Sequence, residues 1–485
     1  MSKLNNIKDE RNLTMLMDFY ELTMSNGYFK EGFKDKVVVF DMFYRANPDH
    51  GGYAIVAGLE QLIDYIENMH FDKDDIAYLN SKNIFDKDFI EYLANFKFRG
   101  DIFAIPEGTP VFPNEPLVTI KAPIIEAQLI ETMLLLTINH QSLIATKASR
   151  IIRAASGRVV MEFGSRRAQG FDAATYGARA AYIGGVPFTA NVTADKLFSV
   201  PAIGTMAHSW IQLFDTEYEA FKVYATNYPD DCTLLIDTYN VMKSGLVNAI
   251  KVANEVLIPM GKRLKGIRLD SGDLAYLSKK VRKSLDEANL QDCKICVSNS
   301  LDEYLIKSLL EQGAKIDSFG IGERLITAKS DPVFGGVYKL AAVEKNNIME
   351  PRIKVSENDE KITNPGYKKL YRIYDNNSGL AIADYITLAD EVIDPKQPLL
   401  LFNPRSIWKQ TLVENYTIRE LQEPIYIKGK LVYKTIALKD IQSYAKQQLE
   451  TLYPETLRFE NPHQHFVDLS KKLYDLKIKM INDKR

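Results

Sequence analysis

The sequence predicts an α/β protein whose middle part has the strand–helix alternation of a parallel barrel. Five short apolar segments each end in a polar or glycine residue, and helical patterns lie between them. Alternation of this kind is typical of a parallel α/β barrel. The composition, 46% hydrophobic and 26% charged, is that of an ordinary globular protein. The five predicted strands are residues 159–163, 233–236, 266–269, 295–297 and 317–319.

The charge and cysteine content narrow the class of protein. A net charge of −2 offers no basic field for nucleic acid or a membrane surface, and no apolar run is long enough to span a bilayer. Three cysteines are too few for a disulfide scaffold, and Cys293 and Cys296 lie in a predicted strand, where side chains alternate between faces. No second pair completes a zinc site. We therefore expect reduced thiols in a cytoplasmic protein that binds neither nucleic acid nor membrane.

The chain before the alternating region is predicted to mix helices and strands. Proline density around residues 106–116 predicts edge strands and turns rather than a central sheet. From Pro123 a long helix is expected to run to about Ala155, with Gly157 as its stop. The other predicted helices are 14–26, 53–68 and two short ones within 74–95, and the predicted strands are 36–44, 97–105 and 110–120.

Beyond about residue 340 the pattern becomes irregular. We expect strands, then a hairpin, then two terminal helices whose lysines form a solvated face. The predicted elements are strands 368–374, 380–386 and 398–402, a hairpin over 424–433, and helices 437–450 and 467–482.

One histidine is the leading candidate for chemistry. Gly204–Trp210 follows an apolar run and opens a predicted helix, in whose first turn His208 lies. Free N–H groups and the positive helix end favour a bound phosphate there and disfavour a charged imidazole. A neutral imidazole beside a phosphate could accept a phosphoryl group, although His208 could also be a satisfied polar residue. The helix is predicted from one apolar face: Ile211, Phe214, Tyr218 and Phe221.

The loop Asp270-Ser271-Gly272-Asp273 is the second candidate. Its two carboxylates could hold Mg²⁺ through water, as a diphosphate requires. The alternative is a turn in which Asp273 caps the following helix. Arg268 alternates in phase with Asp270 on one strand face, so it could offer a bidentate fork to an anionic group.

Other strands of the alternating region also end in polar or glycine residues. In parallel barrels the chemistry gathers at the carboxyl ends of the strands, so these residues together favour a ligand with several phosphates. No Ser-His-Asp arrangement suggests itself, and five of the six histidines lie outside the predicted barrel strands, which argues against a metal hydrolase. The further candidates are Arg166, Arg167, Asp237, Gly320 and Gly322.

These motifs together resemble the nicotinate phosphoribosyltransferase family, in the right order from about residue 14 to 420. One departure stands out: Gly322-Glu323-Arg324 replaces the G-T-[NS] often seen there, so the side chains offered to a phosphate at that loop differ from the family pattern. The matching stretches are Thr14–Tyr28, Phe43–Leu59, Glu162–Gly170 (EFGSRRAQG), Ala181–Leu197, Pro201–Ser209 (PAIGTMAHS), Ile267–Leu274 (IRLDSGDL), Val297–Glu303, Phe319–Leu340 and Lys354–Arg372.

The resemblance implies a type II phosphoribosyltransferase. It implies an N-terminal α+β domain over 1–130, completed by parts of 345–425, an irregular α/β barrel with the active site over 131–344, and return segments with a C-terminal extension over 345–485. The family joins nicotinate to phosphoribosyl pyrophosphate in NAD salvage, releases diphosphate, and hydrolyses ATP through a phosphohistidine. The resemblance also implies a homodimer with shared active sites.

Residue roles follow from the same matching. His208 matches the phosphohistidine; Thr205 and Arg268 would hold the nicotinate carboxylate, Tyr20 would stack on the ring from the partner subunit, and Thr327 would bind the phosphoribosyl donor. Our own assignment adds Asp270 and Asp273, with Mg²⁺, to orient the ribose and the leaving diphosphate. The Lys354–Arg372 motif is left open, since its cations could serve ATP or simply pack.

Two alternatives remain at this point. A nicotinamide phosphoribosyltransferase would act on an amide, which needs no cation, so Arg268 favours nicotinate. A non-catalytic sugar-phosphate or nucleotide sensor would keep the glycine loops but would not need His208 together with Asp270 and Asp273.

Overall fold

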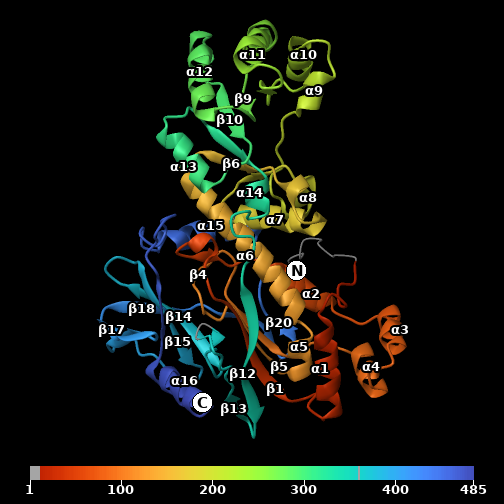
Figure 1. Cartoon of the computed structure of the whole chain (residues 1–485), viewed down its shortest axis with the longest axis vertical. Helices are drawn as coiled ribbons and strands as arrows, with labels where there is room; N and C mark the ends of the chain where they lie inside the picture. The colour runs from red at the N-terminus through yellow and green to blue at the C-terminus, as the bar shows by residue number, and fades with distance from the viewer. Residues whose placement is uncertain (1–10, 359–360, 485) are drawn as a thin grey trace. The chain divides into compact units, whose positions relative to one another are not determined.

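The computed structural model describes residues 11–358 and 361–484 of the chain. It divides into two compact units: the first takes in the described residues of Met1–Thr146 and Val333–Arg485, and the second is Lys147–Pro332. The second unit has the light orange to green colours of Figure 1, and the first has the red and blue ends of the scale. The first unit is therefore built from both ends of the sequence.

A seven-stranded sheet in the order β13-β12-β1-β5-β3-β19-β20 forms the core of the first unit. Strand β1 (Val37–Tyr44) pairs antiparallel with β12 (Gly336–Lys345) on one side and β5 (Val118–Pro123) on the other. Its sequence, VVVFDMFY, places large side chains on both faces, and every residue except Val37 is buried. A strand that is apolar on both faces belongs inside a covered sheet, which explains the central place of β1.

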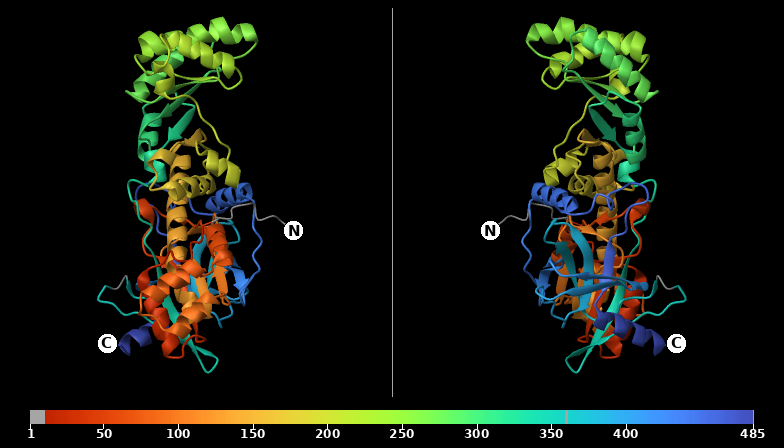
Figure 2. Two further views of the ribbon diagram at one scale, coloured as in Figure 1. Left: turned by 90° about the vertical axis from the view of Figure 1, so that its right-hand side faces the viewer. Right: turned by 90° about the vertical axis from the view of Figure 1, so that its left-hand side faces the viewer.

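A second sheet of the first unit has the order β18-β14-β15-β21. Helix α16 (Lys471–Asn482) packs beside β15 (Ala381–Leu388), near the end marked C in Figure 2. The other elements of the first unit, in chain order, are α1 Phe19–Lys30, β2 Ala54–Ile55, α2 Leu59–Asn68, α3 Lys73–Ser81, α4 Lys87–Ala94, β3 Asp101–Ala104, β4 Pro110–Val111, α5 Ile124–Gln128, α6 Glu131–Ala154 (which extends past residue 146), β13 Ile348–Pro351, β14 Lys368–Asp375, β16 Leu399–Asn403, β17 Ser406–Val413, β18 Tyr416–Glu420, β19 Glu423–Ile427, β20 Lys430–Leu431, α15 Leu438–Glu450 and β21 Phe466–Leu469.

Several boundaries differ from the sequence predictions. The first helix begins at Phe19, where the backbone N–H of Asp18 donates to Glu21 Oε1 at 3.2 Å. Residues 53–68 are not one helix, because Ala54–Ile55 forms β2 and α2 starts only after Gly58, whose φ is 104°. The last predicted helix loses its first turn to β21, which pairs parallel with β15.

The prediction that the proline-rich segment forms edge strands was wrong for β3 and β5. Both lie inside the seven-stranded sheet, and Pro106, Pro113 and Pro116 fall in the connections between strands. Only the short β4, which starts at Pro110, pairs with β2 alone. Prolines in the connections remove no ladder hydrogen bond, so they do not prevent the flanking strands from being central.

The second unit contains a six-stranded parallel sheet in the order β7-β6-β11-β10-β9-β8. All five strands predicted for this region are confirmed, and the two-residue β7 was missed. In the described part of the chain the sheet has β7 and β8 as its edges, so closure of the predicted irregular barrel is not confirmed. The strands are β6 Val159–Glu162, β7 Phe188–Thr189, β8 Thr233–Leu235, β9 Gly266–Leu269, β10 Lys294–Ser298 and β11 Ser318–Ile321.

Helices lie between the strands of this sheet along the sequence. The single helix predicted from His208 onward is two, because Thr216 starts a new one by accepting a hydrogen bond from Glu219 N at 3.2 Å. The helices are α7 Phe171–Ile183, α8 Val192–Phe198, α9 His208–Gln212, α10 Glu217–Asn227, α11 Leu246–Val252, α12 Leu274–Glu287, α13 Glu303–Glu311 and α14 Glu323–Ile326.

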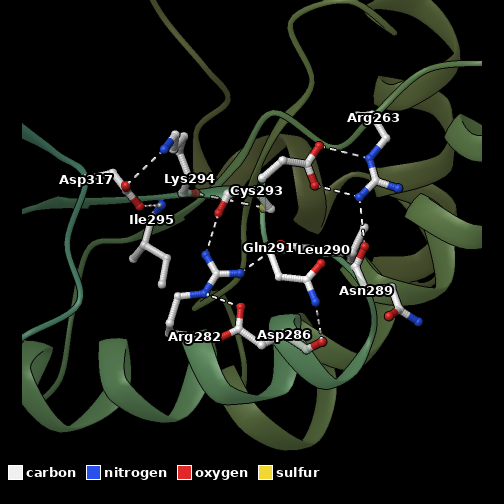
Figure 3. A network of polar contacts seen from close by, with 11 residues as sticks. Arg263, Arg282, Asp286, Asn289, Leu290, Gln291, Cys293, Lys294, Ile295 and Asp317 are labelled. Atoms are coloured by element: carbon white, nitrogen blue, oxygen red, sulfur yellow. Dashed lines mark hydrogen bonds and ion pairs between the residues drawn. The ribbon is translucent and has the colours of Figure 1, made fainter.

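A polar network holds the edge of the sheet where β10 begins (Figure 3). Arg282 of α12 donates to the backbone carbonyls of Leu290 and Cys293, each at 2.7 Å. Asp317 accepts from the backbone N–H of Ile295 at 2.9 Å. These contacts fix the start of β10 against α12 and β11, so the carboxyl end of the strand also has a defined position.

Two further expectations concern the state of the cysteines and the presence of a membrane-spanning helix. Cys232, Cys293 and Cys296 are free and buried, and burial raises the pKa of Cys232 and Cys293 to about 12. In the described ranges 11–358 and 361–484, none of the helices combines the length and apolar character needed to cross a bilayer.

Candidate functional site

The carboxyl ends of β8, β9 and β10 bring four of the polar side chains together. Arg268 lies in β9, in register with Leu235 of β8 and Cys296 of β10. Parallel strands end at the same edge of a sheet, so the residues that follow them meet there. Asp237, Asp270 and Ser298 lie at this edge, just beyond or at the end of their strands.

Arg268 is the hub of the network. Its Nη1 donates to Thr205 Oγ1 at 2.9 Å and to the carbonyl of Met206 at 3.3 Å. Its Nε donates to Ser298 Oγ at 3.1 Å, and Nη2 lies 3.5 Å from Asp270 Oδ1. The side chain is 14% exposed. Arg268 and Thr205, which the resemblance assigned to the same ligand carboxylate, are thus in direct contact.

Asp237 connects this network to the Asp270 loop. The Asp237 carboxylate is 1% exposed, and its Oδ2 accepts from the Asp270 backbone N–H at 2.9 Å and from Ser271 Oγ at 2.7 Å. Ser298 Oγ donates to Asp270 Oδ1. Hydrogen bonds to a carboxylate are stronger than neutral ones, so the loop is held in place by a nearly buried acceptor.

His208 lies on the other side of Asp237. It is the first residue of α9, its Nε2 is 3.3 Å from Asp237 Oδ1, and its ring is 41% exposed. Helix α9 has only five residues, so the helix dipole is smaller than the long predicted helix implied. The sequence analysis did not predict the contact between His208 and Asp237. The feature that could have indicated it is the position of Asp237 just after a short apolar strand.

Asp273 has a structural task. Its Oδ1 accepts from the backbone N–H of Tyr276 at 2.9 Å, so it caps α12, as one of the two sequence interpretations held. Among the described residues there is no group of three or more histidine, cysteine, aspartate or glutamate side chains suited to a metal ion. Asp270 and Asp273 therefore fit Mg²⁺ only when water and a bound diphosphate supply most of the oxygen ligands.

Strand β6 ends in an arginine loop. Arg166 and Arg167 lie in a 3-10 turn, Ser165–Arg167, and both are exposed. The buried Glu162 accepts hydrogen bonds from Gly164 N and, at 2.6 Å, from Thr189 Oγ1, and burial raises the pKa of Glu162. The sequence analysis missed Glu162 as a site residue. Its position at the end of β6, directly before the arginine loop, is the feature that could have indicated it.

The two candidate glycines let another residue approach. A Cβ on Gly320 would lie 2.6 Å from the Phe163 ring, and one on Gly322 would lie 3.0 Å from the Phe163 carbonyl oxygen. The Phe163 ring in turn lies 6.0 Å from the Arg268 guanidinium carbon. Gly320 is inside β11 and Gly322 directly precedes α14. Gly320 thus makes room for the aromatic side chain beside Arg268, and Gly322 makes room for the backbone of the same residue, Phe163.

The loop that departs from the expected motif uses both of its charges in ion pairs. Arg324 pairs with Asp302, and Glu323 pairs with Lys329 at 2.6 Å. Thr327 follows α14, and its hydroxyl donates to the carbonyl of Glu323 at 2.8 Å. The replacement is therefore compatible with an ordered loop.

A cavity lies along one face of the parallel sheet. Its volume is about 1030 Å³, and its lining includes Met161, Phe163, Thr205, Cys296 and Ser318. A flat aromatic ligand is much smaller than this cavity. Phe163 and Thr205, which both contact Arg268, belong to this lining, and the rest of it extends to the amino ends of the strands at Thr233, Gly266 and Lys294.

Tyr20 belongs to the first unit. It lies on α1, its side chain is 43% exposed, and burial of the hydroxyl together with the charge of Glu131 raises its pKa. Its proposed role at the ligand remains a prediction.

Comparisons with known proteins cover nearly the whole chain. Family models match in three segments: the nicotinate phosphoribosyltransferase (NAPRTase) N-terminal domain over residues 15–139, the NAPRTase family over 159–376, and the NAPRTase C-terminal domain over 367–477. A nicotinate phosphoribosyltransferase of Bacillus subtilis is 45% identical and covers 98% of this chain and 96% of its own length. One of Caenorhabditis elegans is 35% identical, with 95% and 92% covered. The crystal structure of human nicotinic acid phosphoribosyltransferase is similar with a TM-score of 0.84 and 28% identity, over 96% of this chain and all of that one.

Proposed function

This chain belongs to the nicotinate phosphoribosyltransferase family, and on that premise we propose that it joins nicotinate to phosphoribosyl pyrophosphate. The products are nicotinate mononucleotide and diphosphate, in the salvage of NAD. The single observation that carries the proposal is the contact of Arg268 with Thr205 beside Phe163 at the cavity. A guanidinium and a hydroxyl beside an aromatic ring suit a ligand that is both aromatic and a carboxylate.

The binding residues would act mainly by placing the reactants. The pyridine nitrogen carries no proton, so the reaction needs no strong base but an aligned nucleophile and charge near the sugar. Arg268 and Thr205 would hold the carboxylate, Phe163 would lie against one face of the ring, and Tyr20 of the partner subunit would stack on the other.

The donor would be held at the neighbouring loops. Arg166 and Arg167 are exposed cations that can pair with phosphate, and Thr327 with the Gly320 and Gly322 segment would complete the phosphate contacts. Asp270 and Asp273 would face the ribose and the diphosphate. Mg²⁺ would arrive with the diphosphate and neutralise part of its charge.

ATP would serve as co-substrate through His208. Phosphorylation of a half-exposed histidine that contacts Asp237 would change the charge next to the Asp270 loop. Such a local charge change can bias a loop toward a state that binds substrates tightly.

Finer features of architecture, assembly and location are also proposed. The six-stranded sheet would be the core of an irregular barrel within 131–344, between a domain over 1–130, completed by parts of 345–425, and the segments over 345–485. Leu16, Phe19, Tyr20 and Met24 expose large apolar side chains at α1, which supports a homodimer interface there. The enzyme would act in the cytoplasm.

The two alternatives are not favoured. Relatives at 45% and 35% identity over nearly the whole chain are named nicotinate phosphoribosyltransferases, which speaks against both a nicotinamide-specific enzyme and a non-catalytic sensor.

The proposal is tested with purified protein, phosphoribosyl pyrophosphate, Mg²⁺ and either nicotinate or nicotinamide, with and without ATP, by assaying the mononucleotide. We expect product from nicotinate, increased by ATP. Product from nicotinamide instead would move the assignment to the amide enzyme, and no product from either would favour the sensor.

His208→Ala tests the role of ATP. We expect the variant to lose stimulation by ATP and to fall toward the ATP-independent rate. Equal stimulation in the variant and in the unaltered protein would remove His208 from the ATP step.

A further inference from the structure

We infer that Asp237 is a positioning residue that makes Nδ1 of His208 the phosphoryl acceptor. The inference rests on the proposed function only in its last step, the phosphorylation itself. The tautomer of His208, which is the physical core of the inference, exists in the free protein and can be measured without substrate.

The first step identifies which oxygen of the Asp237 carboxylate faces the Asp270 loop and which faces His208. Its Oδ2 accepts from the Asp270 backbone N–H at 2.9 Å and from Ser271 Oγ at 2.7 Å. The backbone N–H can only donate. Oδ2 is therefore committed to the loop, and Oδ1 is the atom that faces His208.

The second step is the tautomer of the ring. An ionised carboxylate can only accept hydrogen bonds, so Nε2 of His208, 3.3 Å from Oδ1, carries the proton. In a neutral imidazole the lone pair then lies on Nδ1. No described residue makes a hydrogen bond to Nδ1, and the ring is 41% exposed. Nδ1 is thus a free nucleophile and Nε2 is not.

The third step is the transfer. The Nδ1 lone pair attacks the γ-phosphorus of ATP, an N–P bond forms, and the P–O bond to the β-phosphate breaks with its electron pair leaving on ADP. Nε2 keeps its proton, so the ring becomes positively charged. That charge faces Asp237, whose side chain is 1% exposed, and a carboxylate at this place stabilises an imidazolium as it forms.

Asp237→Asn separates this role from simple packing. The asparagine oxygen must face the Asp270 N–H, because that group needs an acceptor. The asparagine NH₂ then faces His208 and donates to Nε2, which moves the ring proton to Nδ1. The variant keeps the shape of the site but removes the lone pair from Nδ1. Ser271→Ala is the matched control, since it removes one donor to Oδ2 and leaves the Asp270 N–H in place.

The first experiment is ¹⁵N NMR of the imidazole rings in the full-length protein, with the His208 signals identified by their loss in His208→Ala. We expect the Nε2–H tautomer in the unaltered protein and in Ser271→Ala, and the Nδ1–H tautomer in Asp237→Asn. An Nδ1–H tautomer in the unaltered protein overturns the inference. The unaltered spectrum decides even if Asp237→Asn fails to fold.

The second experiment incubates the unaltered protein with ATP and Mg²⁺ and determines which nitrogen carries the phosphate, by ¹H–³¹P correlation. Phosphate on Nδ1 supports the inference and phosphate on Nε2 overturns it. If no phosphohistidine forms, the ATP step of the proposed function fails, and the tautomer measurement still tests the role of Asp237.

Discussion

Each unit of the molecule contains an arginine–aspartate pair, and the two pairs differ in almost every physical respect. In the first unit Arg372 meets Asp384 through two hydrogen bonds, of 2.7 and 2.6 Å, and both side chains are 0% exposed. In the second unit Arg268 lies 3.5 Å from Asp270, and the two side chains are 14% and 31% exposed.

The Arg372 pair is closed to solvent. Arg372 also donates to the carbonyl of Pro110 at 2.9 Å and lies over the Phe112 ring at 5.2 Å. Burial alone would raise the pKa of Asp384, but the Arg372 charge and hydrogen bonds from Glu115 and Arg372 hold that pKa below its usual value. Burial and the charge of Asp384 raise the pKa of Glu115 well above its usual value. Both side chains of the pair are closed to solvent, so a ligand cannot reach them from water.

The Arg268 pair, in contrast, shares its guanidinium with hydroxyl groups and a backbone carbonyl, and these are weak partners that a ligand carboxylate can replace. The difference teaches how to assign the Lys354–Arg372 motif, part of which (residues 359 and 360) lies outside the described residues. Lys368 is buried against Asp41 at 2.7 Å, and Arg372 against Asp384. Lys368 and Arg372 both form buried ion pairs, so they serve packing rather than ATP binding.

The largest expected effect is on stability, from Arg372→Met. The variant leaves Asp384 buried without its cation, and removing one partner of a buried pair costs about 3–5 kcal/mol of the free energy of unfolding. Urea denaturation followed by circular dichroism measures this cost. An unchanged unfolding midpoint would mean that the pair is not structural.

Arg268→Ala should show the opposite division between stability and activity. We expect kcat/KM for nicotinate to fall about 100-fold, or about 2.7 kcal/mol, because the carboxylate loses its bidentate partner. The loss for nicotinamide should be far smaller. Steady-state kinetics with both substrates check this, with urea denaturation as the control for folding. Equal losses for the two substrates would contradict the role of the guanidinium.

A smaller effect concerns a carboxyl group of the first unit that forms no ion pair with a described residue. Burial raises the pKa of Asp468, in β21, from 3.8 to about 6. The folded state therefore favours the protonated form, and stability should decline as the pH rises from 3.8 toward 6.

Asp468→Asn removes that decline. Asp468 is buried, and we expect a gain of about 1 kcal/mol near neutral pH, which shrinks as the pH is lowered toward the unfolded-state pKa. Urea denaturation across this pH range measures it. A constant difference between the two proteins would show that the carboxyl group does not titrate as expected.

The smallest effect is expected for an exposed pair in the network of Figure 3. Arg263 pairs with Asp292 at 2.5 Å, with side chains 45% and 50% exposed. Arg263→Met should change the free energy of unfolding by less than about 1 kcal/mol, because water screens such pairs. A cost as large as that of Arg372→Met would show that burial does not separate the two kinds of pair.

The sequence by itself determined the local features of this protein. Short apolar runs predicted β6, β8, β9, β10 and β11, because a parallel strand that is buried on both faces consists of consecutive apolar residues. The motifs also indicated the family, and the position of each candidate after a strand indicated that the side chains would gather at one edge.

Only the tertiary structure decided the pairings between distant residues. It placed β12 beside β1 and Arg372 against Asp384, joined Glu162 to Thr189, and set Asp237 between His208 and the Asp270 loop. In the described part of the chain the parallel sheet has β7 and β8 as its edges, so the structure does not confirm that the irregular barrel predicted from the alternation of elements is closed. The physical reason is that periodicity and capping depend on neighbours in sequence, whereas register, burial and the partner of a charge depend on residues that the chain brings together only when it folds.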